Sequence, residues 1–135
     1  MADTMQFDLV APERRLASMQ AGSVLIPGAE GDMTAYPGHM PVVTTLRPGV
    51  VAANGPDGAV DFVVSGGFAE IGPEGASVLA ERAMPRDEVT REFIAELMAA
   101  AEAFRAEATG TRVDIAEKTL ADIRALAESL GVSYA

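Results

Sequence analysis

The prolines and glycines of this chain divide it into two parts of different character. All eight prolines lie at or before Pro85, and so do eleven of the thirteen glycines. Proline lacks a backbone donor and glycine destabilises helix interiors, so the first part disfavours long helices. After Pro85 only Gly110 and Gly131 interrupt the chain. The sequence therefore predicts a turn-rich domain over residues 1–85 and a helical domain over residues 86–135.

The first part consists of short apolar runs separated by turn residues. The runs are FDLVAP, GSVLIPG, PVVTTLRPG, GVVAANG, AVDFVVSGG, FAEIGPEG and ASVLAER. Runs of this length and near-regular spacing, rich in valine, isoleucine and phenylalanine, are typical of an all-β sandwich or barrel. The segments NGPDG (54–58) and GPEG (72–75) have the composition of hairpin turns. We predict a β-sandwich.

The second part has the periodicity of two amphipathic helices. Apolar residues recur at three- and four-residue steps in two stripes: Val89, Phe93, Leu97, Ala101, Phe104 and Ala108, then Val113, Ala116, Leu120, Ile123, Ala127 and Leu130. Asp87 is the expected cap of the first helix, Thr111 with Asp114 forms a capping box for the second, and Gly131 suits its end. With Gly110 as the bend, the pattern predicts an antiparallel hairpin whose stripes bury each other.

Composition disfavours several classes of function. The net charge of −10 argues against nucleic acids and against adsorption to anionic lipid, because both need basic patches. The chain has no cysteine and a single histidine, which leaves few ligands for a zinc site. It also lacks a long apolar run and the features of a signal peptide. We therefore expect a soluble intracellular protein without direct lipid insertion.

The only histidine, His39, lies between Pro37 and Pro41. A catalytic histidine needs a nucleophile or metal nearby and a carboxylate that orients its ring, and no recognised motif surrounds the neighbouring hydroxyls. One alternative is an imidazole whose nitrogens tie a Gly/Pro turn together. The sequence favours this architectural role over catalysis.

Two further loops have the residues of a site without its full pattern. Glu30 and Asp32 are close carboxylates, but a calcium cage needs six or more oxygens. The segment SGGF (65–68) lacks the lysine and the following Ser/Thr of a phosphate-binding P-loop. We therefore expect no metal and no cofactor at either loop.

Four segments in series resemble the epsilon subunit family of the rotary F-type ATP synthase: FDLVAPERRL, VLIPGAEGDMTAYPGHMPVVTTLRPGVV, VSGGFAEI and SVLAERA. The resemblance covers nearly all of residues 5–84 and keeps the order and spacing of the family. It implies a non-catalytic subunit of the central stalk, at the cytoplasmic face of the bacterial inner membrane. The sandwich would clamp the gamma subunit and rest on the c-ring, coupling proton-driven rotation to ATP synthesis. The helical hairpin would modulate ATP hydrolysis at the alpha/beta catalytic hexamer.

The resemblance also implies which residues make these contacts. At the interface with gamma and the c-ring they are Glu30, Asp32, Tyr36, His39 and Met40. On the second helix they are the basic residues Arg112, Lys118 and Arg124, which in the family meet an acidic segment of the catalytic beta subunit.

The hairpin departs from the family at one point. Some bacterial members bind ATP through an Ile/Leu-Asp-x-x-Arg-Ala motif at the start of the first helix, and here that region reads DEVTREFIAE. No nucleotide ligand is therefore expected. The alternative to the stalk hypothesis is a free-standing β-sandwich binding module with a helical interaction arm.

Overall fold

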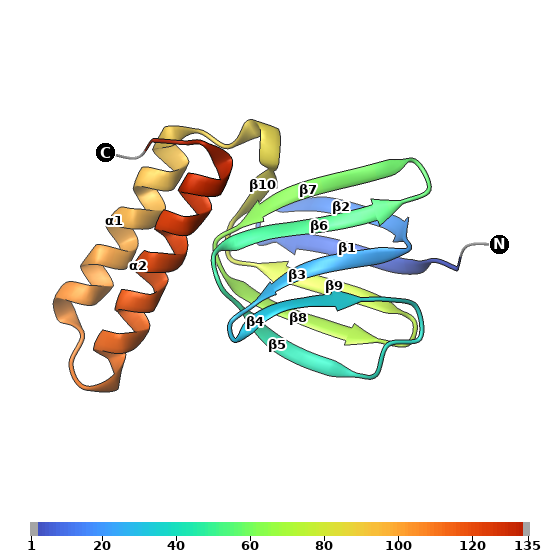
Figure 1. The fold of residues 1–135 in the computed structure, drawn as a ribbon, viewed down its shortest axis with the longest axis horizontal. Helices are drawn as coiled ribbons and strands as arrows, with labels where there is room; N and C mark the ends of the chain where they lie inside the picture. Colours follow the sequence, from blue (N-terminus) through green and yellow to red (C-terminus); the bar gives the residue numbers. More distant parts are fainter. Residues whose placement is uncertain (1–2, 134–135) are drawn as a thin grey trace. The chain divides into compact units, whose positions relative to one another are not determined.

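The computed structural model describes residues 3–133, which form ten β-strands followed by two α-helices (Figure 1). Contacts along the chain group it into two compact units, one ending at Asp87 and the other beginning at Glu88. The strands are β1 (Met5–Ala11), β2 (Arg14–Ala21), β3 (Ser23–Gly28), β4 (Gly31–Ala35), β5 (Val42–Leu46), β6 (Gly49–Gly55), β7 (Gly58–Val64), β8 (Gly67–Gly72), β9 (Gly75–Ala80) and β10 (Ala83–Pro85).

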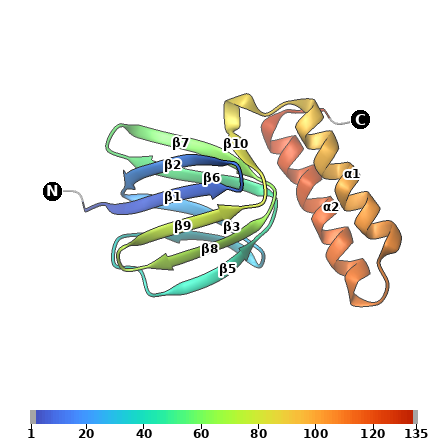
Figure 2. The same cartoon turned by 180° about the vertical axis from the view of Figure 1, so that it is seen from behind.

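The strands form two layers of one continuous hydrogen-bonded sheet. One layer has the order β10-β7-β6-β3, with β4 beside β3, and the other has the order β5-β8-β9-β1-β2. Figure 1 shows the first layer on its near side and Figure 2 shows the second. β3 and β5 join the layers through the single residue pair Gly28 and Leu46. β1 runs parallel to β9, and the other pairs are antiparallel. The predicted β-sandwich is confirmed.

Two predicted hairpin turns join neighbouring strands of this sheet. β6 and β7 are joined through residues 56–57, with Gly55 opposite Gly58. β8 and β9 are joined through residues 73–74, with Gly72 opposite Gly75. Both turns lie in the segments whose Gly, Pro, Asn and Asp content indicated hairpins.

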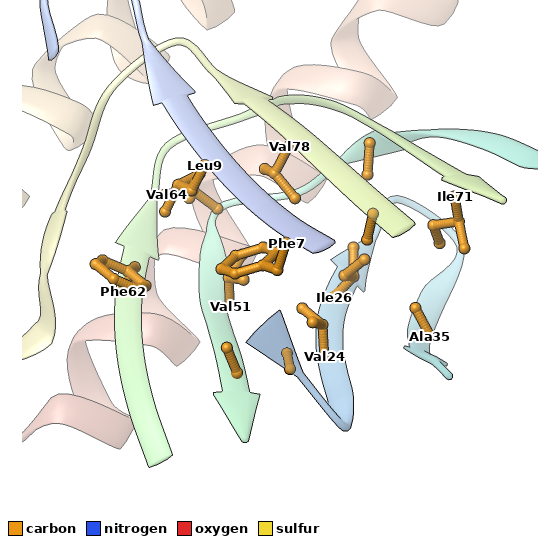
Figure 3. Packing of buried hydrophobic residues seen from close by; sticks show 14 of the residues in the cluster. Phe7, Leu9, Val24, Ile26, Ala35, Val51, Phe62, Val64, Ile71 and Val78 are labelled. Carbon is orange, nitrogen blue, oxygen red and sulfur yellow. The ribbon is translucent and has the colours of Figure 1, made fainter. Parts of the chain in front are cut away.

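An apolar core fills the space between the two layers (Figure 3). Alternate residues of β1, β8 and β9 are buried, as the two-residue period of a strand requires. Phe7 and Leu9 of β1 are fully buried, and so are Val24 and Ile26 of the opposite layer. Among the described residues no polar or charged side chain is buried. The core between the two layers therefore consists of apolar side chains.

The helical unit contains α1 (Arg91–Glu107) and α2 (Thr111–Leu130), preceded by the single 3₁₀ turn η1 (Arg86–Glu88). Figure 1 shows the two helices running antiparallel and side by side. Their buried positions are Phe93, Ile94, Leu97, Met98 and Ala101 on α1, and Ala116, Leu120, Ile123, Leu126 and Ala127 on α2. Phe104 was predicted in the buried stripe but is 41% exposed; it lies in the last turn of α1, beside the connection to α2.

The helix caps differ from the prediction at both N-termini. Thr90, not Asp87, caps α1, and its hydroxyl accepts a hydrogen bond from the Phe93 N–H at 3.2 Å. Asp87 lies inside η1 instead. Gly110 occupies the cap position of α2, which has no side-chain cap bond, so Thr111 is the first helical residue and no capping box forms. Gly131 ends α2 in the left-handed conformation, as predicted.

Phe7 provides a test of the core. Phe7→Ala removes a fully buried ring and should lower the free energy of unfolding by about 3–5 kcal/mol, because the layers cannot close the cavity. Phe68→Ala is the matched control, since this ring is 43% exposed on the outer face of β8 and its loss should cost far less. Urea unfolding followed by circular dichroism measures both. Equal losses would contradict the inward and outward assignment of these strands.

Candidate protein-interaction surface

His39 lies in the loop of residues 36–41, which connects β4 to β5, and its ring stabilises that loop. The imidazole Nδ1–H donates to the carbonyl oxygen of Met40 at 2.7 Å, and the backbone N–H of His39 donates to the Tyr36 carbonyl at 3.0 Å. The tautomer follows from the acceptor, since a carbonyl oxygen can only accept. The ring is therefore a structural part of the turn.

Gly38 anchors the same loop to the neighbouring hairpin. Its N–H donates to the Pro73 carbonyl in the β8–β9 turn at 3.0 Å. Its φ of +84° lies in the region that glycine adopts far more readily than other residues. Loop 36–41 and the turn at residues 73–74 therefore form one connected edge of the sandwich.

Several large apolar side chains are exposed on this loop and on the outer face of the adjoining layer. We call this set the exposed apolar face; it consists of Tyr36 (56% exposed), Met40 (77%), Val43 (70%), Phe68 (43%) and Leu79 (44%). Strand register places Phe68 between Thr45 of β5 and Leu79 of β9, in one row across the sheet. Val43 lies opposite Glu70 in the next row of the same face. Exposed apolar groups that lie side by side, as Phe68 and Leu79 do, are typical of interaction surfaces.

An open groove of about 650 Å³ borders the exposed apolar face. Its lining includes Pro41 from loop 36–41 and the carboxylates of Asp8, Glu70 and Glu74. Gln6, at one side of the groove, donates through Nε2 to the Asp8 carboxylate and to the Ser18 hydroxyl, both at 3.1 Å. The outer face of this layer thus combines an apolar part with an acidic part.

The β3–β4 turn carries the two carboxylates identified in the sequence, and they differ in environment. Glu30 is exposed at the two-residue tip between Gly28 and Gly31. Asp32 forms an ion pair with Arg47, whose Nη1 also donates to the Gly28 carbonyl at 2.6 Å. No group of three or more potential metal ligands occurs among the described residues. The sequence alone did not distinguish the two carboxylates. The structure shows that Asp32 is in an ion pair and that Glu30 is exposed.

The three basic residues expected to act on the second helix are spread along α2. Arg112 and Arg124 are exposed, and the Lys118 ammonium pairs with Asp122 one turn later at 2.8 Å. Steps of six residues rotate each position well away from the previous one around a helix of 3.6 residues per turn. They form a spiral and not a single basic patch.

The sequence patterns did not mark Val43, Phe68, Leu79 or Arg47 as surface residues of interest. The first three could have been found by strand alternation, because each stands between two inward-facing neighbours. Arg47 could not, because its partners Gly28 and Asp32 come from a different hairpin.

Comparison with known proteins identifies the class of this fold. Residues 4–86 match the family model of the ATP synthase delta/epsilon chain β-sandwich domain. The chain belongs to the ATP synthase delta/epsilon chain family. The expectation that the chain is a non-catalytic subunit agrees with that membership.

Relatives named ATP synthase epsilon chain match both units. That of Ruegeria sp. (strain TM1040) is 55% identical over 131 residues, covering 93% of this chain and 96% of the relative. That of Rhodobacter capsulatus is 48% identical over 132 residues, covering 98% and 100%. That of Paracoccus denitrificans is 49% identical, covering 98% and 94%. This membership sets aside the alternative of a free-standing binding module.

Solved structures share the fold. A chain of the Euglena gracilis mitochondrial ATP synthase OSCP/F1/c-ring structure superposes with a TM-score of 0.69 at 23% identity, over 94% of this chain and 81% of that one. A chain of the Tetrahymena thermophila mitochondrial ATP synthase central stalk and c-ring structure gives 0.65 at 14% identity, over 95% and 97%. Neither helix of residues 3–133 is long and apolar enough to span a bilayer.

The positive φ of Gly38 gives a test of how loop 36–41 is held. Gly38→Ala adds a methyl group that meets no atom within 4 Å, so its cost should come from the backbone alone, about 1–2 kcal/mol of unfolding free energy. Gly72→Ala is the matched control, because its added methyl is equally unobstructed and its φ is not positive. Chemical denaturation compares the two. If both variants lose the same stability, the strained conformation of the loop is not what requires glycine.

Proposed function

We propose that this chain is a central-stalk subunit of a rotary ATP synthase, which couples proton-driven rotation of the c-ring to ATP synthesis. The observation that carries the proposal is membership of the family over the whole chain, since relatives named ATP synthase epsilon chain match both units. The two solved neighbours come from ATP synthase assemblies that include a c-ring. As part of such a complex the chain is peripheral, at the cytoplasmic face of the bacterial inner membrane and without inserting into lipid.

The exposed apolar face is the proposed contact with the gamma subunit. It offers large apolar side chains on a rigid sheet, and the core of a protein interface is built from such groups. Tyr36 and Met40 contribute from loop 36–41, and His39 contributes by holding that loop in shape. The acidic groove at its border would meet basic groups on gamma.

The β3–β4 turn is the proposed contact with the polar loops of the c-ring. Glu30 is exposed at its tip, and Asp32 belongs to the same turn through its ion pair with Arg47. A protruding two-residue tip bearing a carboxylate is suited to a polar surface with basic groups. Residues 1–85 would in this way carry both stalk contacts.

The helical hairpin, residues 86–135, is the proposed regulatory element. It would modulate ATP hydrolysis by contacting the alpha/beta hexamer, with Arg112, Lys118 and Arg124 facing acidic groups there. Arg112 and Arg124 are exposed, whereas Lys118 would have to exchange its partner Asp122. Such an exchange costs little free energy. An exposed ion pair between residues four apart on a helix contributes only about 0.3–0.5 kcal/mol to stability.

A charge placed in the exposed apolar face should weaken binding to gamma. Phe68→Glu puts a carboxylate where an apolar contact is expected, so the affinity should fall at least about tenfold, which corresponds to about 1.4 kcal/mol. Leu25→Glu is the matched control, because Leu25 is similarly exposed, at 38%, on the other layer. Isothermal calorimetry with purified gamma measures both, after circular dichroism confirms folding. An equal loss in the two variants would contradict this face as the contact.

Removal of the hairpin should separate coupling from regulation. A fragment ending at Asp87 keeps every strand and the whole apolar core, so it should fold, bind gamma and support ATP synthesis in a reconstituted complex. The hydrolysis rate of that complex should equal or exceed that of the complex with the full chain. The two rates are recorded in proteoliposomes. An unfolded fragment, or a complex that hydrolyses ATP without pumping protons, would show that the helices belong to the coupling element.

A further inference from the structure

Met40 has the most exposed of the large apolar side chains in residues 3–133, at 77%. The other methionines that the structure describes are all better shielded from solvent: Met5 is 3% exposed, Met98 is 7% exposed, and Met19, Met33 and Met84 are half-buried. The chain contains no cysteine, so methionine carries all of its sulfur. The Met40 thioether is therefore the most accessible sulfur in the part of the chain that the structure describes.

The backbone on both sides of Met40 keeps this residue at the surface. Its carbonyl oxygen accepts the hydrogen bond from His39 Nδ1 at 2.7 Å, and the His39 N–H donates to the Tyr36 carbonyl at 3.0 Å. On the other side, Pro41 restricts the backbone of Met40 to extended conformations, as a proline does to the residue before it. Met40 cannot move toward the core without breaking these contacts, so its sulfur stays accessible in the folded chain.

An accessible thioether has a defined reaction with hydrogen peroxide. A sulfur lone pair attacks one peroxide oxygen, the O–O bond breaks, and the products are methionine sulfoxide and water. Sulfur gives up an electron pair and the peroxide accepts it, so no further oxidant or reductant takes part. The reaction leaves the net charge unchanged and converts a flexible apolar side chain into a polar one that accepts hydrogen bonds.

Oxidation of Met40 would place a polar group within the exposed apolar face, to which Tyr36 and Val43 also belong. The sulfoxide oxygen is hydrated in the free chain, and an apolar contact would remove that hydration without replacing it. We propose that Met40 is an oxidation site of the unassembled chain, and that its conversion to the sulfoxide by a peroxide lowers the affinity for gamma until a methionine sulfoxide reductase restores the thioether. The inference rests on the proposed function, in which this face contacts gamma.

Peptide mass spectrometry of the folded full chain measures which methionine reacts first. The chain is treated with hydrogen peroxide, and the sulfoxide at each methionine is followed over time. Met40 should react at least about tenfold faster than Met5 and Met98, whose sulfur becomes accessible only when their surroundings open. Purified gamma, added before the peroxide, should slow the reaction at Met40 because the contact covers its sulfur. Equal rates at Met40 and Met5 would overturn the assignment of the site.

Isothermal calorimetry with purified gamma measures the consequence of the oxidation. The oxidised chain should bind about three- to tenfold more weakly than the untreated chain. Incubation with the two stereospecific methionine sulfoxide reductases and dithiothreitol should restore the affinity, because together they reduce both epimers of the sulfoxide. Circular dichroism before each titration checks that the chain is still folded. Unchanged affinity after complete oxidation of Met40 would overturn the proposed effect on assembly.

Variants locate the effect, and each is compared with itself before and after peroxide treatment. Met40→Leu keeps an apolar side chain without sulfur, so its affinity for gamma should not respond to peroxide. Met84→Leu is the matched control, because it removes a half-buried methionine of β10 and leaves Met40 in place, so the response should persist. Met40→Gln, which is polar without oxidation, should bind more weakly than the unaltered chain even before treatment. The same response in Met40→Leu and Met84→Leu would show that the damage lies elsewhere and would overturn the proposal.

Failure of the proposed function and failure of this inference give different results. If the untreated chain does not bind gamma, the proposed contact fails and the effect of oxidation on assembly fails with it, while mass spectrometry still decides whether Met40 is the reactive residue. If the untreated chain binds gamma but gamma does not slow the oxidation of Met40, the contact lies away from Met40 and the effect on assembly is overturned. If gamma protects Met40 and the sulfoxide weakens binding, both parts of the proposal hold.

Discussion

The structure of the first unit depends on the burial of a purely apolar layer between two sheets. The inward positions of β1, β3, β6, β7, β8 and β9 supply that layer, and no polar side chain of the described residues is buried within it. Each fully buried leucine, valine or phenylalanine contributes on the order of 1.5–3 kcal/mol. Because the inward positions are all used for packing, contact with other molecules is left to the outward faces and the turns.

Core register therefore also determines the exposed apolar face. Ala69 lies opposite Val78 in the core, and this pairing places Phe68 beside Leu79 on the outside. A shift by one residue would expose the alternate set of side chains and bury Phe68, at the expense of the core. Any substitution that disturbs the inward register should thus disturb the proposed gamma contact too, even when the substituted residue is not part of it.

Local sequence patterns predicted those features that local physics determines. The sandwich, the turns at residues 56–57 and 73–74, the two helices and the C-cap at Gly131 all follow from glycine, proline and apolar spacing within a few residues. The predicted N-caps were wrong, although both residues are of types that favour the cap position. Asp87 lies in a 3₁₀ turn, and Thr111 is the first residue inside α2. Capping residues mark a helix start only to within a few positions.

The candidate site was predicted only in part, because its contacts are not local. Loop 36–41 stood out through its prolines and single histidine, and Glu30 with Asp32 through their charge. The pairing of Asp32 with Arg47 joins residues 15 positions apart in different hairpins, and no periodicity reports such a contact. Likewise, the bond from Gly38 to Pro73 depends on β5 and β8 being neighbours in the sheet.

The two units differ in how their contacts are distributed along the sequence, and this supports the proposed division of roles. In the sandwich, β1 pairs with β9, so that Gln6 lies opposite Gly75. The first strand is therefore hydrogen-bonded to a strand that comes more than 60 residues later in the chain. Loss of one such strand disrupts distant ones, which makes the sandwich cooperative and suited to transmitting torque between two partners. The hairpin depends on contacts between two consecutive helices joined by a short connection. A unit held by local contacts can change its surroundings while keeping its own structure, as a regulatory arm must.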